Sequence, residues 1–187
     1  MSVLSSEDPE IQQLIRGNPL LSHATIIGSG NFCKVFRASK KTRVLKLTAD
    51  RTHYEYLVDA NSPKGIFKPL VYRDMGKIGR TGTDMDVYLV EVERLREIGF
   101  GSENEKVIHK LIDFEDKNDR LPVTRKEAPG LPRELLQFMK ELNEFTNLGS
   151  AHYDLCRRNF MERRNGTLVF SDPVFDQETC DTYYWES

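Results

Sequence analysis

The spacing of hydrophobic residues predicts a short helix near the beginning of the chain. Ile11, Leu14 and Ile15 lie three and four positions apart, which places them on one helical face. Asp8, followed by a proline at the first helical position, is a typical helix start. Gly17 is expected to end this helix.

After this helix the apolar residues no longer follow helical spacing. Short runs rich in β-branched and aromatic residues predict five strands. They lie at residues 23–27, 32–38, 42–48, 67–74 and 84–92. A short helix over 51–60 is predicted between the third and fourth strands, with Tyr54, Leu57 and Val58 directed inward. The glycine-rich segment 75–83 predicts a hairpin turn.

The rear half of the chain has the periodicity of helices. Ser102 and Glu105 form a capping box before a helix over 106–114, and residues 115–130 are predicted to form a loop. A second helix is predicted over 131–149, ending at Gly149. Asn165-Gly166 then predicts a tight turn between two short strands. The order of elements indicates an α+β fold with a β-rich front and a helical back.

Composition places the chain among ordinary globular proteins. Of its 187 residues 39% are hydrophobic and 30% charged, and the net charge is −2, which argues against a dedicated nucleic-acid or membrane binder. Cys33, Cys156 and Cys180 are far apart and odd in number, so neither a disulfide framework nor a zinc site is indicated. With no secretory signal at the start, a cytoplasmic location is expected.

The first candidate for chemistry is the stretch "IIGSGNFCKVF", which contains Gly28 and Gly30. A dinucleotide fingerprint needs a helix after the glycines, whereas a predicted strand follows here. A glycine loop between antiparallel strands can fold over a triphosphate, since its backbone N–H groups approach phosphate oxygens without Cβ interference. The same glycines also fit an ordinary hairpin turn.

Lys46 lies within the predicted strand 42–48, beside apolar residues. A lysine that points into a cleft from such a strand can hold phosphate oxygens, and a buried ammonium needs an anionic partner. Glu55 on the next helix is the nearest candidate. Both side chains also fit a plain solvent-exposed role.

The second candidate is an acid–amide–acid set. Asp154 and Asn159 precede the predicted hairpin, and Asp172 follows it, so the hairpin can fold Asp172 back towards Asn159. An amide oxygen and a carboxylate suit Mg²⁺ that carries nucleotide phosphates, and Asp154 could accept a proton from a hydroxyl. Each residue alone also fits a turn.

In this order the motifs resemble those of the protein-kinase superfamily. "GSGNFCKVF" resembles the glycine-rich loop, "VLK" the strand with the ATP-binding lysine, and "LVEVERL", which includes Glu91, the hinge between lobes. "HYDLCRRN" resembles the catalytic loop, and "SDPV" stands in place of the D-F-G motif. The short form is most similar to the early-gene serine/threonine kinases of podophages, which implies host cytoplasm and bacterial host proteins as substrates.

The resemblance implies a minimal bilobal fold. An N-terminal helical extension would cover residues 1–19, an N-lobe with a five-stranded antiparallel sheet 20–93, and a truncated helical C-lobe 94–187. ATP and Mg²⁺ are the implied cofactors, and neither a membrane nor a specific nucleic acid is an implied partner.

The resemblance also implies roles for the nucleotide-binding residues. Gly28 and Gly30 would cover the phosphates, and Val35 would pack on the adenine. Lys46 would contact the α- and β-phosphates and pair with Glu55, and Glu91 at the hinge would take part in cofactor binding.

In the catalytic loop, Asp154 would be the base, and Asn159 and Asp172 would bind Mg²⁺. His152 would be a structural residue that orients the loop. Two residues depart from the family pattern: Tyr153 replaces an arginine, and Cys156 replaces the lysine that neutralises the γ-phosphate.

Arg157 and Arg158 are candidates to replace that lysine, and Arg158 is the one we assign to catalysis. The resemblance leaves three functions open. The first is an active serine/threonine kinase, and the second is a nucleotide-binding pseudokinase that inhibits a host protein. The third is a small-molecule kinase, for which the chain is short.

Overall fold

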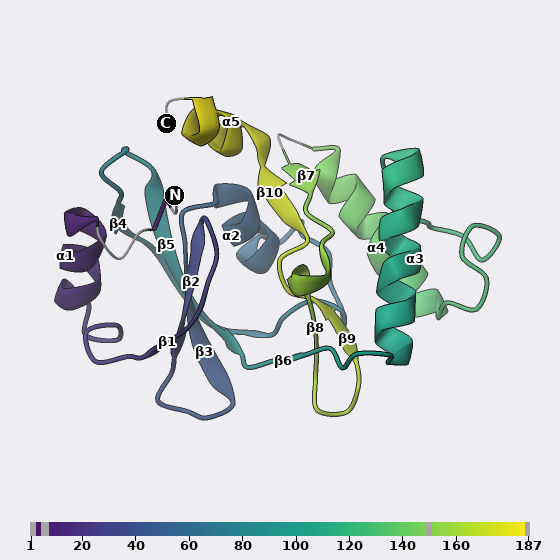
Figure 1. Cartoon of the computed structure of the whole chain (residues 1–187), viewed down its shortest axis with the longest axis horizontal. Coiled ribbons are helices and arrows are strands. Elements are labelled where there is room, and N and C mark those ends of the chain that lie inside the picture. The colour runs from purple at the N-terminus through teal and green to yellow at the C-terminus, as the bar shows by residue number, and fades with distance from the viewer. Residues whose placement is uncertain (1–2, 5–7, 149–150, 186–187) are drawn as a thin grey trace. The chain divides into compact units, whose positions relative to one another are not determined.

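The computed structural model describes residues 3–4, 8–148 and 151–185. The chain forms two compact units, which are described separately. Unit 1 comprises Met1–Tyr54, Leu70–Arg94 and Thr179–Ser187, and unit 2 comprises Glu55–Pro69 and Leu95–Glu178. Figure 1 labels the elements of both units.

Unit 1 is built on a five-stranded antiparallel sheet, which confirms that part of the predicted α+β fold. The strand order is β1-β2-β3-β5-β4. The strands are β1 (Ile26–Ser29), β2 (Cys33–Arg37), β3 (Arg43–Thr48), β4 (Val71–Arg80) and β5 (Asp86–Glu93). Strands that follow one another pair as hairpins, except that β3 pairs with β5.

The predicted turn over 75–83 is wrong in its extent. Strand β4 continues to Arg80, and the turn lies at residues 81–85, where the N–H of Thr81 bonds the carbonyl of Met85. The strand tolerates its glycines because its pairing with β5 is irregular between Asp74 and Lys77. Gly76 sits within this irregularity with a φ of +67°, a conformation that favours glycine.

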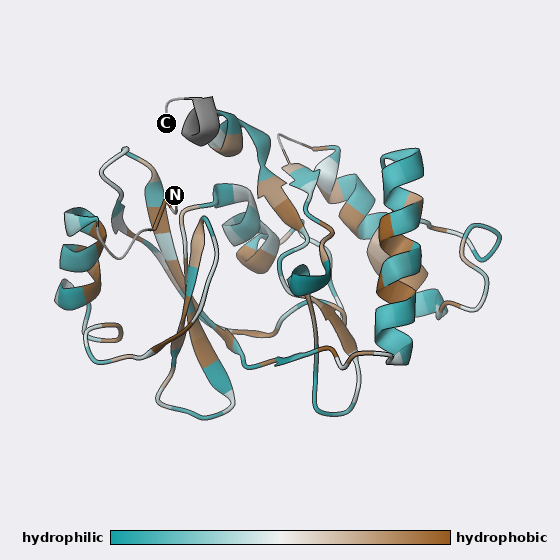
Figure 2. Cartoon of the chain, viewed as in Figure 1, coloured by the Kyte–Doolittle hydropathy of each residue, from teal (hydrophilic) through white to brown (hydrophobic). Residues whose placement is uncertain are grey.

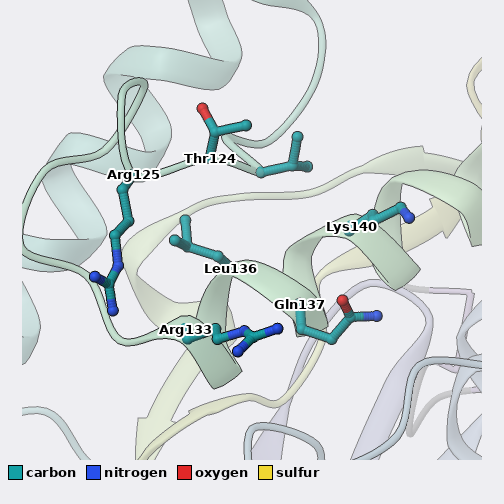
Figure 3. A pocket seen from close by; sticks show the side chains of 7 residues that line it. Thr124, Arg125, Arg133, Leu136, Gln137 and Lys140 are labelled. Carbon is teal, nitrogen blue, oxygen red and sulfur yellow. The ribbon is translucent and has the colours of Figure 1, made fainter.

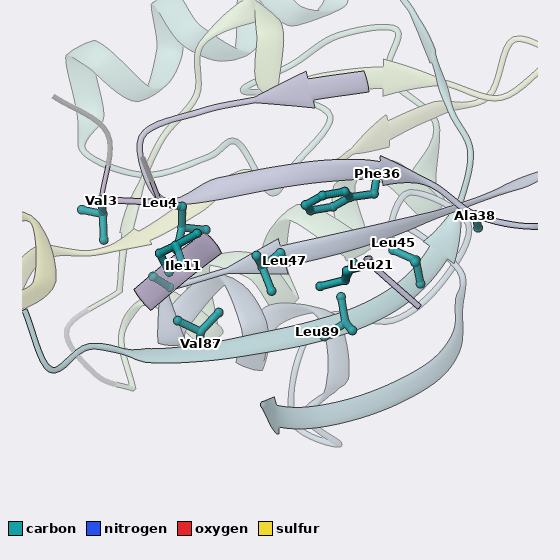
Figure 4. Packing of buried hydrophobic residues seen from close by; sticks show 11 residues of the cluster. Val3, Leu4, Ile11, Leu21, Phe36, Ala38, Leu45, Leu47, Val87 and Leu89 are labelled. Atoms are coloured by element: carbon teal, nitrogen blue, oxygen red, sulfur yellow. The ribbon is translucent and has the colours of Figure 1, made fainter. Parts of the chain in front are cut away.

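Helix α1 (Pro9–Gly17) confirms the first predicted helix. The carboxylate of Asp8 accepts a hydrogen bond from the N–H of Glu10 at 2.8 Å, which satisfies one of the free donors at the helix start. Figure 2 shows the apolar residues of α1 along one side of the helix. Ile11 on that side is fully buried in the main core of unit 1, drawn in Figure 4.

Helix α2 (Arg51–Val58) begins in unit 1 and ends in unit 2. The carboxylate of Asp50 accepts a hydrogen bond from the N–H of His53 at 2.8 Å and so caps the N-terminus of α2. Leu57 is buried as predicted, whereas Tyr54 and Val58 are half-buried. The most deeply buried aromatic side chain of this helix is Tyr56, which the periodicity did not single out.

Unit 2 contains α3 (Glu103–Asn118) and α4 (Arg133–Thr146). The capping box is confirmed in part: Ser102 Oγ accepts from the N–H of Glu105, but the Glu105 carboxylate accepts from Gly101. Helix α3 extends four residues into the predicted loop, through 115–118. The core face of α4 carries Leu135, Leu136, Phe138, Met139 and Leu142. Gly149, predicted to end the second helix, lies outside the described residues.

The predicted hairpin of unit 2 is confirmed as β8 (Phe160–Glu162) and β9 (Leu168–Phe170). Gly166 in its turn has a φ of +84°. Apart from a short 3₁₀ helix that is described with the site below, four further elements were not predicted from the sequence, because they are short or lie at the end of the chain. They are β6 (Arg96–Glu97), β7 (Ala151–Tyr153), β10 (Val174–Asp176) and α5 (Gln177–Trp185).

Candidate functional site

The predicted acid–amide–acid set lies in unit 2, where β7 ends and β10 begins. The two strands pair antiparallel, with Tyr153 opposite Val174. The end of β7 and the start of β10 therefore meet at one place. The N–H of Asp154 donates to the carbonyl of Pro173 at 2.9 Å, so Asp154 lies directly beside the segment that contains Asp172.

Asn159 joins the other two members of the set. It ends the short 3₁₀ helix η1 (Arg157–Asn159) and is 8% exposed. Its side-chain Nδ2 donates to the carbonyl of Asp154 at 2.7 Å. Its own carbonyl accepts from Ser171 Oγ at 2.8 Å and from the N–H of Asp172 at 3.2 Å. The expected return of Asp172 towards Asn159 across the hairpin is thus confirmed.

This arrangement leaves one side-chain oxygen of Asn159 available for a hard cation. Because Nδ2 of Asn159 is committed to Asp154, Oδ1 is the side-chain atom left to accept, and no described residue donates to it. Together with the Asp172 carboxylate it fits Mg²⁺, which keeps most of its water ligands. Within the described part of the chain, no group of three or more His, Cys, Asp or Glu residues could hold a metal.

Two adjacent arginines have different surroundings. Arg157 donates from Nε to Glu105 at 2.8 Å and from a terminal nitrogen to the carbonyl of Ile98 at 2.9 Å, so its guanidinium is already committed. The pKa of Arg158 is raised by Cys156 first, and also by the negative charges of Asp154 and Asp172. The positive charge of Arg158 therefore interacts electrostatically with both acids.

Cys156 itself remains a neutral thiol. Burial raises the pKa of Cys156, and the nearby Asp154 carboxylate raises it further. It cannot supply the positive charge that a lysine would place here. Among the neighbours of Asp154 described above, Arg158 is the residue that can.

The loop is anchored by Tyr153, not by His152 as expected. His152 is exposed, and its side chain forms no hydrogen bond with any described residue; its ring lies 5.9 Å from that of Phe175. The hydroxyl of Tyr153 donates to Asn143 Oδ1 and accepts from Thr146 Oγ1 at 3.1 Å. Both partners are on α4, so Tyr153 ties the residue before Asp154 to a packed helix.

Tyr56 is a second residue that sequence reasoning missed. Its hydroxyl donates to the carbonyl of Phe170 at 2.8 Å, at the end of β9. Burial raises the pKa of Tyr56 well above its ordinary value, and the charge of Asp172 adds to this effect. The tyrosine thus stays protonated and holds the strand that leads to Asp172. Its place on the buried side of α2 is the only signal in the sequence that could have found it.

In unit 1 the cross-strand register aligns the predicted nucleotide-binding residues. Gly28 lies opposite Val35, Val35 opposite Lys46, and Lys46 opposite Val90. Directly opposed residues share one face of a sheet. The residues adjacent to Lys46 along β3, Leu45 and Leu47, belong to the core on the other face. Lys46 is nevertheless only 8% exposed.

The backbone does not require a glycine at either predicted loop position. Neither Gly28 nor Gly30 has a positive φ. A Cβ on Gly28 would meet Val35 at an ordinary 3.6 Å, and one on Gly30 would meet nothing within 4 Å. The hairpin turn therefore does not explain these glycines. Gly30 leaves clear space above the backbone, and Gly28 leaves room for ordinary contact with Val35.

Glu91 is not brought to the sheet face that carries Lys46. Glu91 lies opposite Leu45, on the face away from Lys46, and its carboxylate forms an ion pair with Arg43 at 3.4 Å. Any contribution of Glu91 to a site beside Lys46 would come from its backbone, not from its side chain. Glu55 lies on α2, in the part of the helix that belongs to unit 2.

Comparisons with known proteins leave the family of the chain open. No family model matches it, and no curated protein matches it. In the described part of the chain, no helix is long and apolar enough to cross a membrane.

Proposed function

We propose that the chain is an ATP-dependent serine/threonine protein kinase that phosphorylates bacterial host proteins. The observation that carries the proposal is the tether through Asn159, which contacts Asp154 with its side chain and Asp172 with its carbonyl. An acid, an amide and a second acid in this order match the roles that phosphoryl transfer requires.

In this proposal Asp154 accepts the proton of the substrate hydroxyl. Its carboxylate receives no hydrogen bond from any described residue, which leaves it available as a base. Oδ1 of Asn159 and the carboxylate of Asp172 hold Mg²⁺, which would neutralise phosphate charge when bound. Arg158 supplies the positive charge that the neutral thiol of Cys156 cannot.

The residues of unit 1 supply nucleotide binding. Lys46 contributes an ammonium group to the phosphates, and Val35 on the same sheet face contributes an apolar surface for the base. Gly28 and Gly30 allow the phosphates to approach the backbone closely.

The test is transfer of label from γ-labelled ATP, with Mg²⁺, to the proteins of a bacterial lysate. We expect Asp154→Asn to lower incorporation by at least about a hundredfold, the usual contribution of a positioned base. Asp116→Asn, an exposed acid on α3, is the matched control and should retain full activity. No incorporation by the wild-type chain, or the same incorporation by Asp154→Asn, would refute the proposal.

The second candidate is a pseudokinase that binds a nucleotide and inhibits a host protein. The neutral Cys156 in place of a catalytic lysine is the observation that favours it. A chain with both Asp154→Asn and Asp172→Asn would then keep its full effect on host cells. Loss of that effect in the double variant would favour the active kinase.

A further inference from the structure

A second candidate binding site lies in unit 2, between residues 123–125 and one face of α4. These residues line a hollow of about 440 Å³, which we call the α4 hollow (Figure 3). Arg133, Leu136, Gln137 and Lys140 follow at helical spacing, so they share the face of α4 that lines it. Arg125 projects from the loop that precedes the helix, as Figure 3 shows.

The hollow combines cations with a small apolar surface. Arg125, Arg133 and Lys140 line it, whereas no acidic residue does. Leu136, which is 5% exposed, and the half-buried Val123 add the apolar part. A phosphate ester on an aliphatic chain has the complementary character, because guanidinium groups bind phosphate oxygens in pairs.

The two arginines are free to bind a ligand. The guanidinium groups of Arg125 and Arg133 form no hydrogen bond or ion pair with any described residue. Lys140 lies 3.8 Å from Glu144, which is a weak exposed pair. Exposed arginines without partners in one concave place lose no existing contact when an anion binds.

Two acids near the hollow, Glu127 and Glu141, accept hydrogen bonds from groups other than Arg125 and Arg133. Glu127 forms an ion pair with Arg120 and accepts hydrogen bonds from the N–H groups of Val123 and Thr124, each at 3.0 Å. Glu141 accepts from Gln137 Nε2 at 3.0 Å and from the N–H of Lys64 at 3.0 Å. Their charges are thereby partly compensated, and they compete little for the arginines.

The loop that carries Arg125 is held in place before any ligand arrives. Glu127 closes the turn over 123–127 through the bonds just described. At the start of the loop, the side chain of Asn143 on α4 accepts from the N–H of Leu121 at 2.9 Å and donates to its carbonyl at 3.0 Å. A pre-formed loop lowers the entropy cost of binding.

We propose that the α4 hollow binds a phosphorylated segment of a protein, with Arg125 and Arg133 on the phosphate and Leu136 against a neighbouring aliphatic side chain. Clusters of arginine are a recurring means of recognising phosphorylated peptides. This inference does not depend on the proposed kinase activity, because none of its residues belongs to the acid–amide–acid set.

The test is fluorescence anisotropy without ATP, using a labelled peptide library with a central phosphoserine and degenerate flanks. We expect it to bind at least about tenfold more tightly than the same library with serine, a difference of about 1.4 kcal/mol. The double variant Arg125→Ala with Arg133→Ala should lose that preference. Lys126→Ala, an exposed cation on the same loop that does not line the hollow, should keep it.

Both substituted arginines are exposed, so the variant should melt at the wild-type temperature, which circular dichroism checks. Equal affinity for the two libraries, or unchanged affinity in the double variant, would overturn the proposal. So would inorganic phosphate bound as tightly as the phosphopeptides, because a simple anion site explains that result. Arginine-dependent preference for a random single-stranded oligonucleotide over the phosphopeptides would overturn it as well.

Discussion

The side-chain amide of Asn159 donates to the main-chain carbonyl of Asp154 over 2.7 Å. This bond ties the end of η1 to the end of β7, and it orients the remaining oxygen of the Asn159 side chain. The carbonyl of the same residue accepts from Ser171 and Asp172. One buried residue therefore connects three segments of unit 2, and its amide cannot be replaced by a group that lacks a donor.

Asn159→Asp removes that donor without changing the size of the side chain. It leaves a partly buried carbonyl without its partner and places a carboxylate beside it, so we expect the free energy of unfolding to fall by about 1–3 kcal/mol. Urea denaturation measures the change. Asn165→Asp is the control, since Asn165 uses only its oxygen, as acceptor for Thr167. Equal stability of Asn159→Asp and wild type would contradict the role of the tether.

Gly30→Ala should change nucleotide binding, whereas Gly76→Ala should change stability. An alanine at position 30 meets no atom within 4 Å, so stability should change by less than about 0.5 kcal/mol, while the KM for ATP rises several-fold. At position 76, where φ is +67°, alanine should lower stability by about 1–2 kcal/mol. Thermal melts and ATP titrations measure both. An unchanged KM in Gly30→Ala would argue that this glycine has no part in nucleotide binding.

Arg157→Ala and Arg158→Ala separate structure from chemistry at adjacent positions. Arg157→Ala loses bonds to Glu105 and to the backbone, which should cost about 1 kcal/mol of stability at this partly exposed site. Arg158→Ala should leave stability unchanged and lower phosphotransfer by at least about tenfold. Denaturation and a kinase assay on both variants check this. The reverse pattern would remove Arg158 from the proposed mechanism.

Glu127 makes unit 2 sensitive to acid. The hydrogen bonds from Arg120, from the backbone of Val123 and from Thr124 lower the pKa of this carboxyl from 4.5 to about 2. Its stabilising contribution is complete above pH 4.5, where the unfolded chain is also ionised, and is lost as the pH falls towards 2.

Glu127→Gln should therefore flatten the dependence of stability on pH within this window. Urea midpoints measured at successive pH values give the slope. Glu134, an exposed acid in the first turn of α4, provides the control. The variant Glu134→Gln should show the same slope of stability against pH as the wild-type chain. A slope in Glu127→Gln equal to that of wild type would show that other groups account for acid sensitivity.

Local patterns in the sequence were sufficient for most helices, strands and turns. The Asp8-Pro9 start of α1, the alternation in β2 and β3, and the Asn165-Gly166 turn all depend on neighbouring residues. The approach of Asp172 to Asn159 was predictable for the same reason, since a tight hairpin brings its two flanks together whatever surrounds it.

Other features depended on contacts between residues far apart in the chain. The tether of Tyr153 to α4 and the bond from Tyr56 to Phe170 require particular helices to pack beside particular strands. Arg157 has a structural role and Arg158 does not, because Glu105 on α3 lies within hydrogen-bonding distance of Arg157. None of these partners can be identified from spacing.

The sequence by itself determined the elements of this protein and the order of its polar residues, because hydrophobic period and turn chemistry act over a few positions. Only the tertiary structure decided which side chains lie together on the same face of the sheet. Glu91 shows the reason: pairing opposite Leu45 instead of Lys46 turns its side chain to the other side of the sheet. That register is set by the packing of the whole core, which no short stretch of sequence contains.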